Sequence, residues 1–262
     1  IHSVPYCRST PLFYYNKAVA QELGIEIGDM ITIDELVKFG QAAMVKNDAG
    51  ETTRYGFEIF NDFGYYNAAW IYQLGSEYLA EGGGSPSLED GTMLKVLTDW
   101  RDWVDAGWCR VFDVTNAGDT AQTMFVNGEL AAYMNSSAGL GGLLQAAAET
   151  GVEVGVAMFP TYDPEHHVAE IGGANLSVVG ADNSEEEIQA SWEFVKYIMG
   201  DEEQFFNAKT SGYVPCTKSV AEYPEMVSFW EENPEFKVAY DQLLSYGRGQ
   251  EMPFVAVGQD FT

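Results

Sequence analysis

Three short strings of this sequence combine hydroxyl, amide and glycine residues, whose shared chemistry is hydrogen bonding to a polar solute. They are Ser-Thr-Pro-Leu-Phe-Tyr-Tyr-Asn-Lys at 9–17, Gly-Gly-Ala-Asn-Leu-Ser-Val-Val at 172–179 and Ser-Gly-Tyr-Val-Pro at 211–215. The first leads from an apolar, strand-like stretch into a helix start. The other two put glycines and polar side chains where a strand gives way to a loop, which exposes backbone donors to a ligand. The strings therefore indicate a solute receptor in preference to an enzyme.

A fourth polar string is suited to an anion or a sugar hydroxyl. A short buried strand is predicted from Leu130 to Met134, and it feeds Asn135, Ser136, Ser137 and a glycine-spaced helix. Free backbone N–H groups and the positive end of the helix dipole favour a ligand at such a place. Simple N-capping of the helix by Ser136 or Ser137 explains the same residues equally well.

Aromatic residues gather between residues 60 and 70, around several small polar residues. Flat apolar rings pack well against the C–H faces of a sugar, while nearby polar groups bind its hydroxyls. Most of these aromatics are expected in the core. Phe63 and Tyr65 are expected to reach a ligand, because Gly64 and polar neighbours indicate a loop.

The elements that must position these strings follow from capping signals and apolar spacing. Thr32 with Glu35 forms a capping box at a helix start, and Ser184 begins a second helix with three glutamates in its first turn. That second helix has an apolar stripe of Ile188, Trp192, Val195 and Met199. Residues 171–179 are predicted to form a central strand, and residues 65–79 an aromatic-rich helix. Trp100, Trp103 and Trp108 are expected to serve packing.

The strings, their order and their spacing resemble a known family. Further matches are Val-Gly-Val-Ala-Met-Phe-Pro at 154–160 and Trp-Glu-Phe-Val-Lys-Tyr at 192–197. Together they resemble the extracellular solute-binding proteins (family 1) of carbohydrate and glycerol-3-phosphate-type ABC importers. The resemblance implies a helix-rich α/β chain with the type II periplasmic-binding-protein-like two-lobe fold. It also implies a non-catalytic protein that closes over a small polar solute and delivers it to ABC transporter permease subunits.

The resemblance predicts how the chain is divided. In the family, the first string lies where the chain first crosses between lobes, so its position here indicates a fragment that lacks the start of the N-terminal lobe and the C-terminal end. Residues 1–158 are expected to be mostly second lobe, 159–214 the remaining part of the first lobe, and 215–262 the return to the second lobe. Location at the extracellular face of the membrane or in the periplasm is expected, with an export signal and any lipid anchor outside this chain.

Candidate ligand contacts follow from the resemblance, position by position. Ser9 is implied as a hydroxyl contact, Gly172 and Gly173 as backbone donors, and Tyr213 as a phenolic partner. A phosphate-binding arginine falls near Arg248, although the loose match can place Glu251 there, and Arg8 is an alternative source of positive charge. The full candidate set is Ser9, Thr10, Phe63, Tyr65, Ser136, Ser137, Gly172, Gly173, Asn175, Tyr213 and Arg248.

Composition limits the partners and cofactors. The 40 acidic and 13 basic residues give a formal net charge of −27, which disfavours nucleic acid and anionic membranes as partners. No cofactor or metal is predicted: His166 and His167 are adjacent, and adjacent histidines on a strand or loop usually point apart. Cys7, Cys109 and Cys216 are too few for a disulfide framework. Free thiols are expected, with a Cys7–Cys216 pair as the alternative.

Two other functional classes stay open at this stage. With so many acids, a carbohydrate-active hydrolase using paired carboxylates is compatible with the composition. The sequence nevertheless has no nucleophile elbow, no His-Glu-x-x-His string and no phosphate loop. An acidic surface adhesion or scaffold protein is the second alternative. A ligand cleft lined by the three strings would separate a receptor from both.

Overall fold

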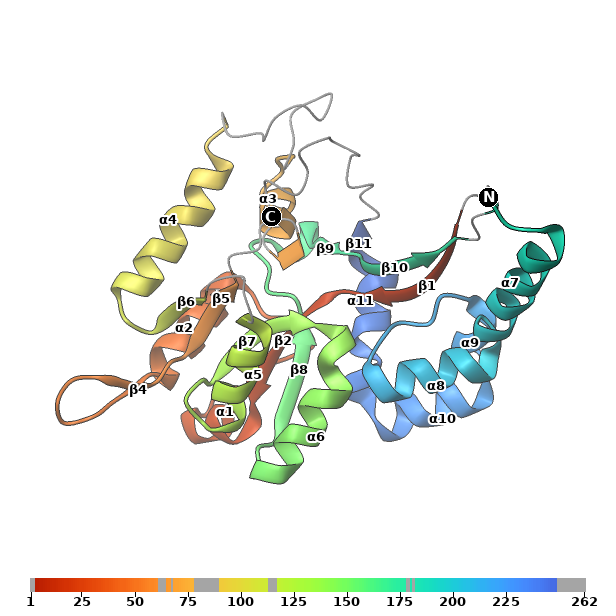
Figure 1. Ribbon diagram of the computed structural model, residues 1–262. Coiled ribbons are helices and arrows are strands. Elements are labelled where there is room, and N and C mark those ends of the chain that lie inside the picture. Colours follow the sequence, from red (N-terminus) through yellow and green to blue (C-terminus); the bar gives the residue numbers. More distant parts are fainter. Residues whose placement is uncertain are drawn as a thin grey trace.

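The chain forms a helix-rich α/β structure in a computed structural model that describes residues 3–60, 65–66, 68–77, 90–112, 117–177, 180 and 182–248 (Figure 1). The strands are β1 (Val4–Ser9), β2 (Pro11–Asn16), β3 (Val45–Lys46), β4 (Thr52–Arg54), β5 (Phe57–Phe60), β6 (Cys109–Phe112), β7 (Ala132–Ser136), β8 (Val154–Met158), β9 (Ala169–Glu170), β10 (Gly172–Leu176) and β11 (Gly247–Arg248). The helices are α1 (Lys17–Leu23), α2 (Ile33–Ala43), α3 (Ala68–Gln73), α4 (Thr92–Asp105), α5 (Ala117–Val126), α6 (Leu140–Thr150), α7 (Glu185–Ile198), α8 (Asp201–Ser211), α9 (Lys218–Ala221), α10 (Pro224–Glu232) and α11 (Val238–Tyr246). None of the helices in the described ranges is long and apolar enough to cross a membrane.

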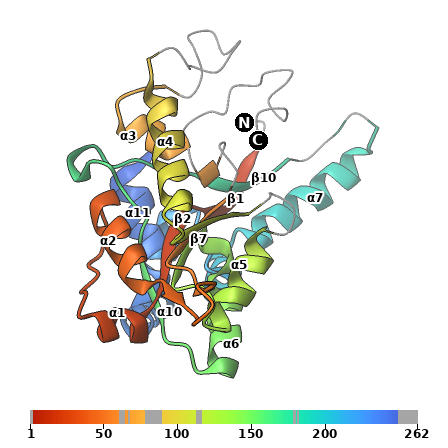
Figure 2. The ribbon, with the colours of Figure 1, turned by 90° about the vertical axis from the view of Figure 1, so that its left-hand side faces the viewer.

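A three-stranded antiparallel sheet forms the middle layer of the larger part of the molecule. Its order is β7-β2-β8, so β2 is the central strand. Alternate residues of β2 enter different cores: Phe13 packs into one, and Leu12 and Tyr14 into the other. Helices α1 and α2 lie on one side of the sheet and α5 and α6 on the other (Figure 2). The sheet is therefore buried on both faces.

The helix starts follow from local sequence. Thr32 accepts a hydrogen bond from the Glu35 amide at 3.2 Å, and the Glu35 carboxylate accepts one from the Thr32 amide at 2.9 Å. Ser184 and Glu187 form the same arrangement at the start of α7. Both predicted capping boxes are confirmed, because this chemistry depends only on residues three apart.

Tryptophan packing holds α3 and α4 on the first core. Trp70 contacts Trp100 and Trp103 edge to face, with ring centroids 6.1 and 6.2 Å apart, and Trp103 lies 5.4 Å from Trp108. The predicted packing role of Trp100, Trp103 and Trp108 is confirmed. The predicted helix over 65–79 is wrong at its C-terminal end: residues 65–66 and α3 are helical, but α3 ends at Gln73 and Gly75 takes a positive φ of 82°. Residues 67, 78 and 79 lie outside the described residues.

A two-stranded ribbon leads away from the central sheet toward α7. In it β1 pairs with β10 antiparallel, with Ser9 opposite Gly172 (Figure 1). The prediction of a central strand over 171–179 is wrong for the described residues, because β10 pairs there with β1 alone. Its middle residues, 173–175, are exposed. Val178 and Val179, also included in that prediction, lie outside the described residues.

The predicted apolar stripe of α7 is only partly covered, because Val195 is buried, Ile188 and Met199 are half-buried and Trp192 is exposed. Val195 is the one buried residue of the helix, whereas Trp192 is 43% and Tyr197 62% exposed. Phe206 of α8 is also 62% exposed, and with Tyr197 and Tyr6 it lines a groove of 570 Å³. Soluble proteins rarely leave such aromatic surfaces uncovered.

Candidate functional site

Three hydroxyl groups from distant parts of the sequence meet where β1 ends. The Tyr65 phenolic oxygen lies 3.1 Å from Oγ of Ser9 and 3.3 Å from Oγ of Ser136. Ser9 is the last residue of β1, Ser136 ends β7, and Tyr65 precedes α3. Each hydroxyl can both donate and accept hydrogen bonds. Ser9 is buried, with 4% of its surface exposed, whereas Tyr65 and Ser136 are half-buried.

The crossing from β1 to β2 holds this cluster in place. The Ser137 amide donates to the Thr10 carbonyl at 2.9 Å, and the Thr10 amide donates to Oγ of Ser137 at 3.3 Å. Thr10 and Ser137 both have no exposed surface. We therefore infer that Thr10 and Ser137 stabilise the connection between β1 and β2, because both are buried and a ligand cannot reach them in this structure. Ser136 Oγ also accepts from the Ala138 amide at 3.3 Å, which caps the short 3-10 helix Ser137–Gly139. The N-capping interpretation therefore holds for this turn, whereas α6, with Gly139 as its N-cap residue, has no side-chain cap.

Two glycines allow β10 to pass close to this cluster. A Cβ atom on Gly172 would lie 2.5 Å from Cε2 of Tyr65 and 2.9 Å from Oγ of Ser9. Gly173 has a φ of 111°, and a Cβ atom there would lie 1.9 Å from the Cys7 carbonyl oxygen. Both contacts are shorter than side chains tolerate. The Gly-Gly pair thus sets the distance between the ribbon and the Tyr65 ring.

Replacing Gly172 with alanine is expected to displace Tyr65 and break its contact with Ser9. We expect a stability loss of about 1–3 kcal/mol, typical of inserting a methyl group into a packed site, measured by chemical denaturation. Gly142 on α6 is a matched control, because a Cβ atom there meets nothing within 4 Å. Gly142→Ala should stabilise the protein by up to about 1 kcal/mol. Equal effects of both substitutions would contradict the packing argument.

Tyr213 lies beside the cluster, on the turn that follows α8. The Val214 amide donates to the Arg8 carbonyl at 2.7 Å, which ties this turn to β1. Gly212 permits the turn, with a φ of 105°. The structure therefore brings Ser9, Tyr65, Ser136, Gly172 and Tyr213 close together, although they come from five separate segments of the chain.

The Tyr65 phenol is neutral at physiological pH. Burial raises the pKa of Tyr65 to about 12, the hydrogen bonds from Ser136 and Ser9 counteract this, and the charges of Glu170 and Tyr213 raise it further. A neutral phenol between two serine hydroxyls is a hydrogen-bonding group. It is not poised as a base.

Arg8 and Asn175 lie apart from the hydroxyl cluster. The Arg8 guanidinium donates to Oδ1 of Asn175 and, at 3.4 Å, to the Ala174 carbonyl. Successive side chains of a strand point to opposite faces, so Arg8 lies across the ribbon from Ser9. The structure thus groups Asn175 with Arg8 and separates both from Tyr65.

Glu170 is the site residue that the sequence reasoning missed. Its side chain is 6% exposed, and it lies two residues before Gly172. Its strand, β9, pairs in parallel with β11, and Arg248 is the Cα partner of Glu170. The Arg248 side chain and the whole of Phe63 lie outside the described residues. An acid within Val-Ala-Glu-Ile, directly before the Gly-Gly pair, was the signal available in the sequence.

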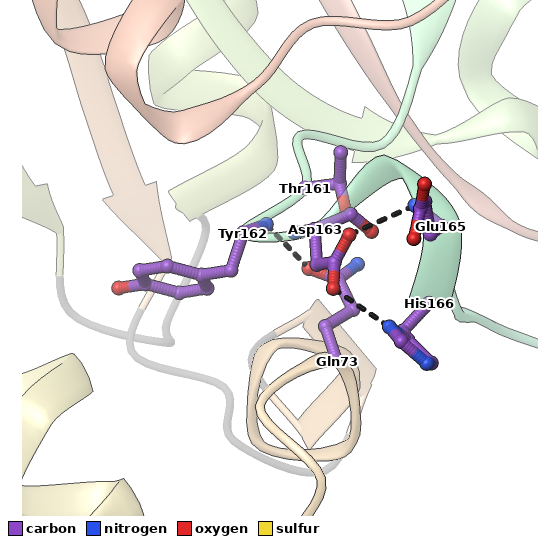
Figure 3. Close-up of polar contacts among 6 residues, drawn as sticks. All are labelled: Gln73, Thr161, Tyr162, Asp163, Glu165 and His166. Atoms are coloured by element: carbon purple, nitrogen blue, oxygen red, sulfur yellow. Dashed lines mark hydrogen bonds and ion pairs between the residues drawn. The ribbon is translucent and has the colours of Figure 1, made fainter.

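The two adjacent histidines have separate environments. His166 is exposed, and its Nδ1 lies 2.6 Å from Oδ2 of Asp163 (Figure 3). His167 is buried, and its Nδ1 lies 3.4 Å from Nε2 of Gln73. Asp163 raises the pKa of His166, and burial lowers the pKa of His167 to about 4. In the part of the chain that the structure describes, no three His, Cys, Asp or Glu residues are grouped to hold a metal. Cys7 and Cys216 are free thiols.

The comparisons with known proteins agree with this architecture. A family model described as bacterial extracellular solute-binding protein matches residues 1–238. The chain belongs to this family. It is 28% identical over 253 residues to the sn-glycerol-3-phosphate-binding periplasmic protein UgpB of Rhizobium meliloti (strain 1021), covering 92% of this chain and 55% of the relative. The chain thus spans about half the length of the curated relatives it matches.

Solved structures show the same fold. The crystal structure of UgpB from Mycobacterium tuberculosis in complex with glycerophosphocholine matches with a TM-score of 0.83 at 23% identity, over 99% of this chain and 63% of that one. The maltose/maltodextrin-binding domain MalE from Bdellovibrio bacteriovorus, bound to maltotriose, matches with a TM-score of 0.73 at 20% identity, over 99% and 65%. The predicted family and the predicted helix-rich periplasmic-binding-protein fold are confirmed.

Proposed function

We propose that the protein containing this chain binds a small polar solute and delivers it to the permease subunits of an ABC importer. The observation that carries the proposal is the cluster of Ser9, Tyr65 and Ser136, in which three segments present hydroxyls at one crossing. Sugars, oligosaccharides, polyols and glycerol phosphates are the ligand classes that suit these groups. The similar proteins named sn-glycerol-3-phosphate-binding UgpB and maltose/maltodextrin-binding MalE support the same range.

The ligand is proposed to lie between two lobes. The larger layer around β2 would be second lobe, and the ribbon with α7 and α8 would belong to the first, in line with boundaries at 158 and 214. The exposed aromatic side chains of α7 and α8 support this division, because a complete lobe would cover them. A ligand held by both lobes would favour the closed state, since only that state provides all the contacts.

The proposed role is non-catalytic and belongs outside the cytoplasmic membrane. The neutral Tyr65 phenol and its serine partners support binding by hydrogen bonds without proton transfer. The candidate contacts are the side chains of Ser9, Tyr65, Ser136 and Tyr213 and the backbone of Gly172 and Gly173. Two further candidates are Phe63 and Arg248, whose side chains lie outside the described residues. We propose that Asn175 acts on the ligand only indirectly, through its hydrogen bond with Arg8.

Calorimetric titration of the complete natural polypeptide tests the proposal. The panel is maltotriose, glycerol, glycerol 3-phosphate and glycerophosphocholine. Tyr65→Phe should weaken binding of the best ligand about 5–30-fold, because it removes one hydroxyl and leaves two serines without their partner. Tyr55→Phe is the matched control and should change binding less than twofold. A folded protein that binds none of the panel, or turns one of them over, would contradict the proposal.

A further inference from the structure

Two cysteines that are far apart in the sequence lie on the same edge of β1. Val214 is the antiparallel bridge partner of Arg8, and its amide donates to the Arg8 carbonyl at 2.7 Å. The chain that follows α8 therefore runs antiparallel to β1 at this point. Continuing the register by two residues brings Cys216 opposite Tyr6, the residue directly before Cys7.

A hydrogen bond shows that the chain still follows β1 at Cys216. The Cys216 Sγ donates to the Tyr6 carbonyl oxygen at 3.1 Å. Opposite residues of antiparallel strands have Cα atoms about 4.5–5.5 Å apart, so Cys7 and Cys216, offset by one residue, have theirs about 6 Å apart. Disulfides are found at Cα separations of about 4.4–6.8 Å. A bond between these two cysteines therefore requires side-chain rotation and little movement of the backbone.

The structure describes the reduced form of the pair, in which both thiols are free. The Cys7 Sγ accepts from Nδ2 of Asn207 at 3.6 Å, a weak bond that rotation can break. Cys7 is buried and Cys216 is half-buried, so a dissolved oxidant reaches Cys216 first. Burial raises the pKa of Cys216 to about 11. Because only the thiolate reacts, the folded reduced protein is oxidised slowly at neutral pH.

We propose that Cys7 and Cys216 form a stabilising disulfide that joins β1 to the segment after α8. The oxidant is a small-molecule or protein disulfide. The Cys216 thiolate attacks it and releases one thiolate, and the Cys7 thiolate then attacks the Cys216 sulfur and releases the second. Two cysteine thiols are oxidised and one disulfide is reduced to two thiols, while the protons that the cysteines lose pass through water to the two released thiolates.

This bond stabilises the crossing between segments that are distant in the sequence. It closes the long loop between positions 7 and 216, and long loops gain most from closure. Cys216 lies three residues after Tyr213, so the bond also holds the Tyr213 turn against the ribbon. The family to which the chain belongs is described as extracellular, and disulfides persist in such surroundings. The bond does not depend on which solute is bound.

Peptide mapping of the complete natural polypeptide tests this cross-link. The reduced protein is refolded from urea in a buffer of oxidised and reduced glutathione, then alkylated in urea and digested. We expect a peptide pair joined through Cys7 and Cys216, with Cys109 alkylated. When the folded reduced protein is oxidised instead, the rate of linkage should rise about tenfold per pH unit below the thiol pKa, because the thiolate fraction does so.

Urea denaturation measures what the bond contributes. The linked protein should have a urea midpoint about 1 M higher than the same protein in a reductant. Cys216→Ser should remove this difference between the oxidised and the reduced sample. Cys109→Ala is the matched control and should keep the difference, because Cys109 is buried in β6.

Several results would overturn the proposal. One is alkylation of both Cys7 and Cys216 after oxidative refolding, and another is a link from either residue to Cys109 or to glutathione alone. A linked protein with an unchanged urea midpoint would also overturn it, since the bond would then strain the crossing. If Cys216→Ser does not fold, the peptide map and the two midpoints of the unmodified protein decide.

Discussion

Replacing Gln242 with alanine is expected to lower the free energy of unfolding by about 3–5 kcal/mol. The Gln242 side chain is completely buried in α11, and its Nε2 donates to Oγ1 of Thr10 at 2.6 Å and to the Pro11 carbonyl at 2.8 Å. Its Oε1 accepts from the Phe159 amide at 2.6 Å. Alanine would leave all three partners buried without these bonds. Buried polar groups left in that state cost about 1–3 kcal/mol each.

Gln189→Ala provides the comparison for this experiment. Gln189 lies on the exposed face of α7 and donates to Glu193 at 2.6 Å. Its loss should change the free energy of unfolding by less than about 0.5 kcal/mol, because water replaces a surface partner. Both variants are measured by urea denaturation with fitted m-values. A Gln242→Ala loss below about 1 kcal/mol would show that water enters the crossing and satisfies the freed groups.

Gln242 also links helix α11 to segments beside the central sheet. Thr10 and Pro11 join β1 to β2, and Phe159 directly follows β8. One amide side chain therefore ties α11 to two adjacent connections beside the central sheet. These connections lead toward the ribbon that carries Ser9 and Gly172. We expect Gln242→Ala to loosen the hydroxyl cluster as well as the fold.

Features that depend on neighbouring residues could be predicted from the sequence. The capping boxes at Thr32 and Ser184 are set by side chains three residues apart, and the alternation of β2 reflects strand geometry. The stripe of α7 was also predicted, but its burial was not. Periodicity identifies an apolar face without showing whether anything covers it. In the structure Trp192 is exposed, although it lies on the same stripe as the buried Val195.

The hydroxyl cluster could be predicted only in part. Ser9, Ser136 and Gly172 were identified from strings that resemble a family, yet their meeting with Tyr65 depends on sheet register between distant segments. Glu170 was missed because it lies outside the polar strings, although it stands two residues before Gly172. Thr10 and Ser137 were placed among ligand contacts because their hydroxyls adjoin those strings. Both residues are buried, and the hydrogen bond between them instead stabilises the connection between β1 and β2.

A second acid, Glu58, is buried in the core without the partners that a charge requires. It is 0% exposed in β5, and neither carboxylate oxygen has a hydrogen-bond partner of standard geometry among the described residues. Burial raises the pKa of Glu58 well above its usual value, which the nearby Met134 amide counteracts in part. Burial therefore favours the protonated form of Glu58 in the folded protein. In the unfolded chain it ionises at an ordinary pKa of about 4.3.

This difference makes folding stability fall as pH rises. Above about pH 4.3 the unfolded state releases the Glu58 proton while the folded state keeps it. The unfolded state thus binds fewer protons, and Glu58 lowers the free energy of unfolding by about 1.4 kcal/mol per pH unit until the folded pKa is reached. The contribution is fully favourable only below the unfolded pKa. Glu58→Gln, which cannot ionise, should lack this loss.

Urea denaturation of Glu58→Gln and the unmodified protein between pH 5 and 8 measures the effect. We expect the variant to gain stability relative to the unmodified protein as pH rises, by up to about 1.4 kcal/mol per pH unit below the folded pKa of Glu58. Glu149→Gln removes the same charge from an exposed residue of α6, and its stability should run parallel to that of the unmodified protein. Parallel curves for Glu58→Gln would show that the Glu58 carboxylate is ionised and solvated in the folded protein.

Because Glu58 lies in β5 beside β7, whose end carries Ser136, its ionisation at high pH should also disturb the hydroxyl cluster.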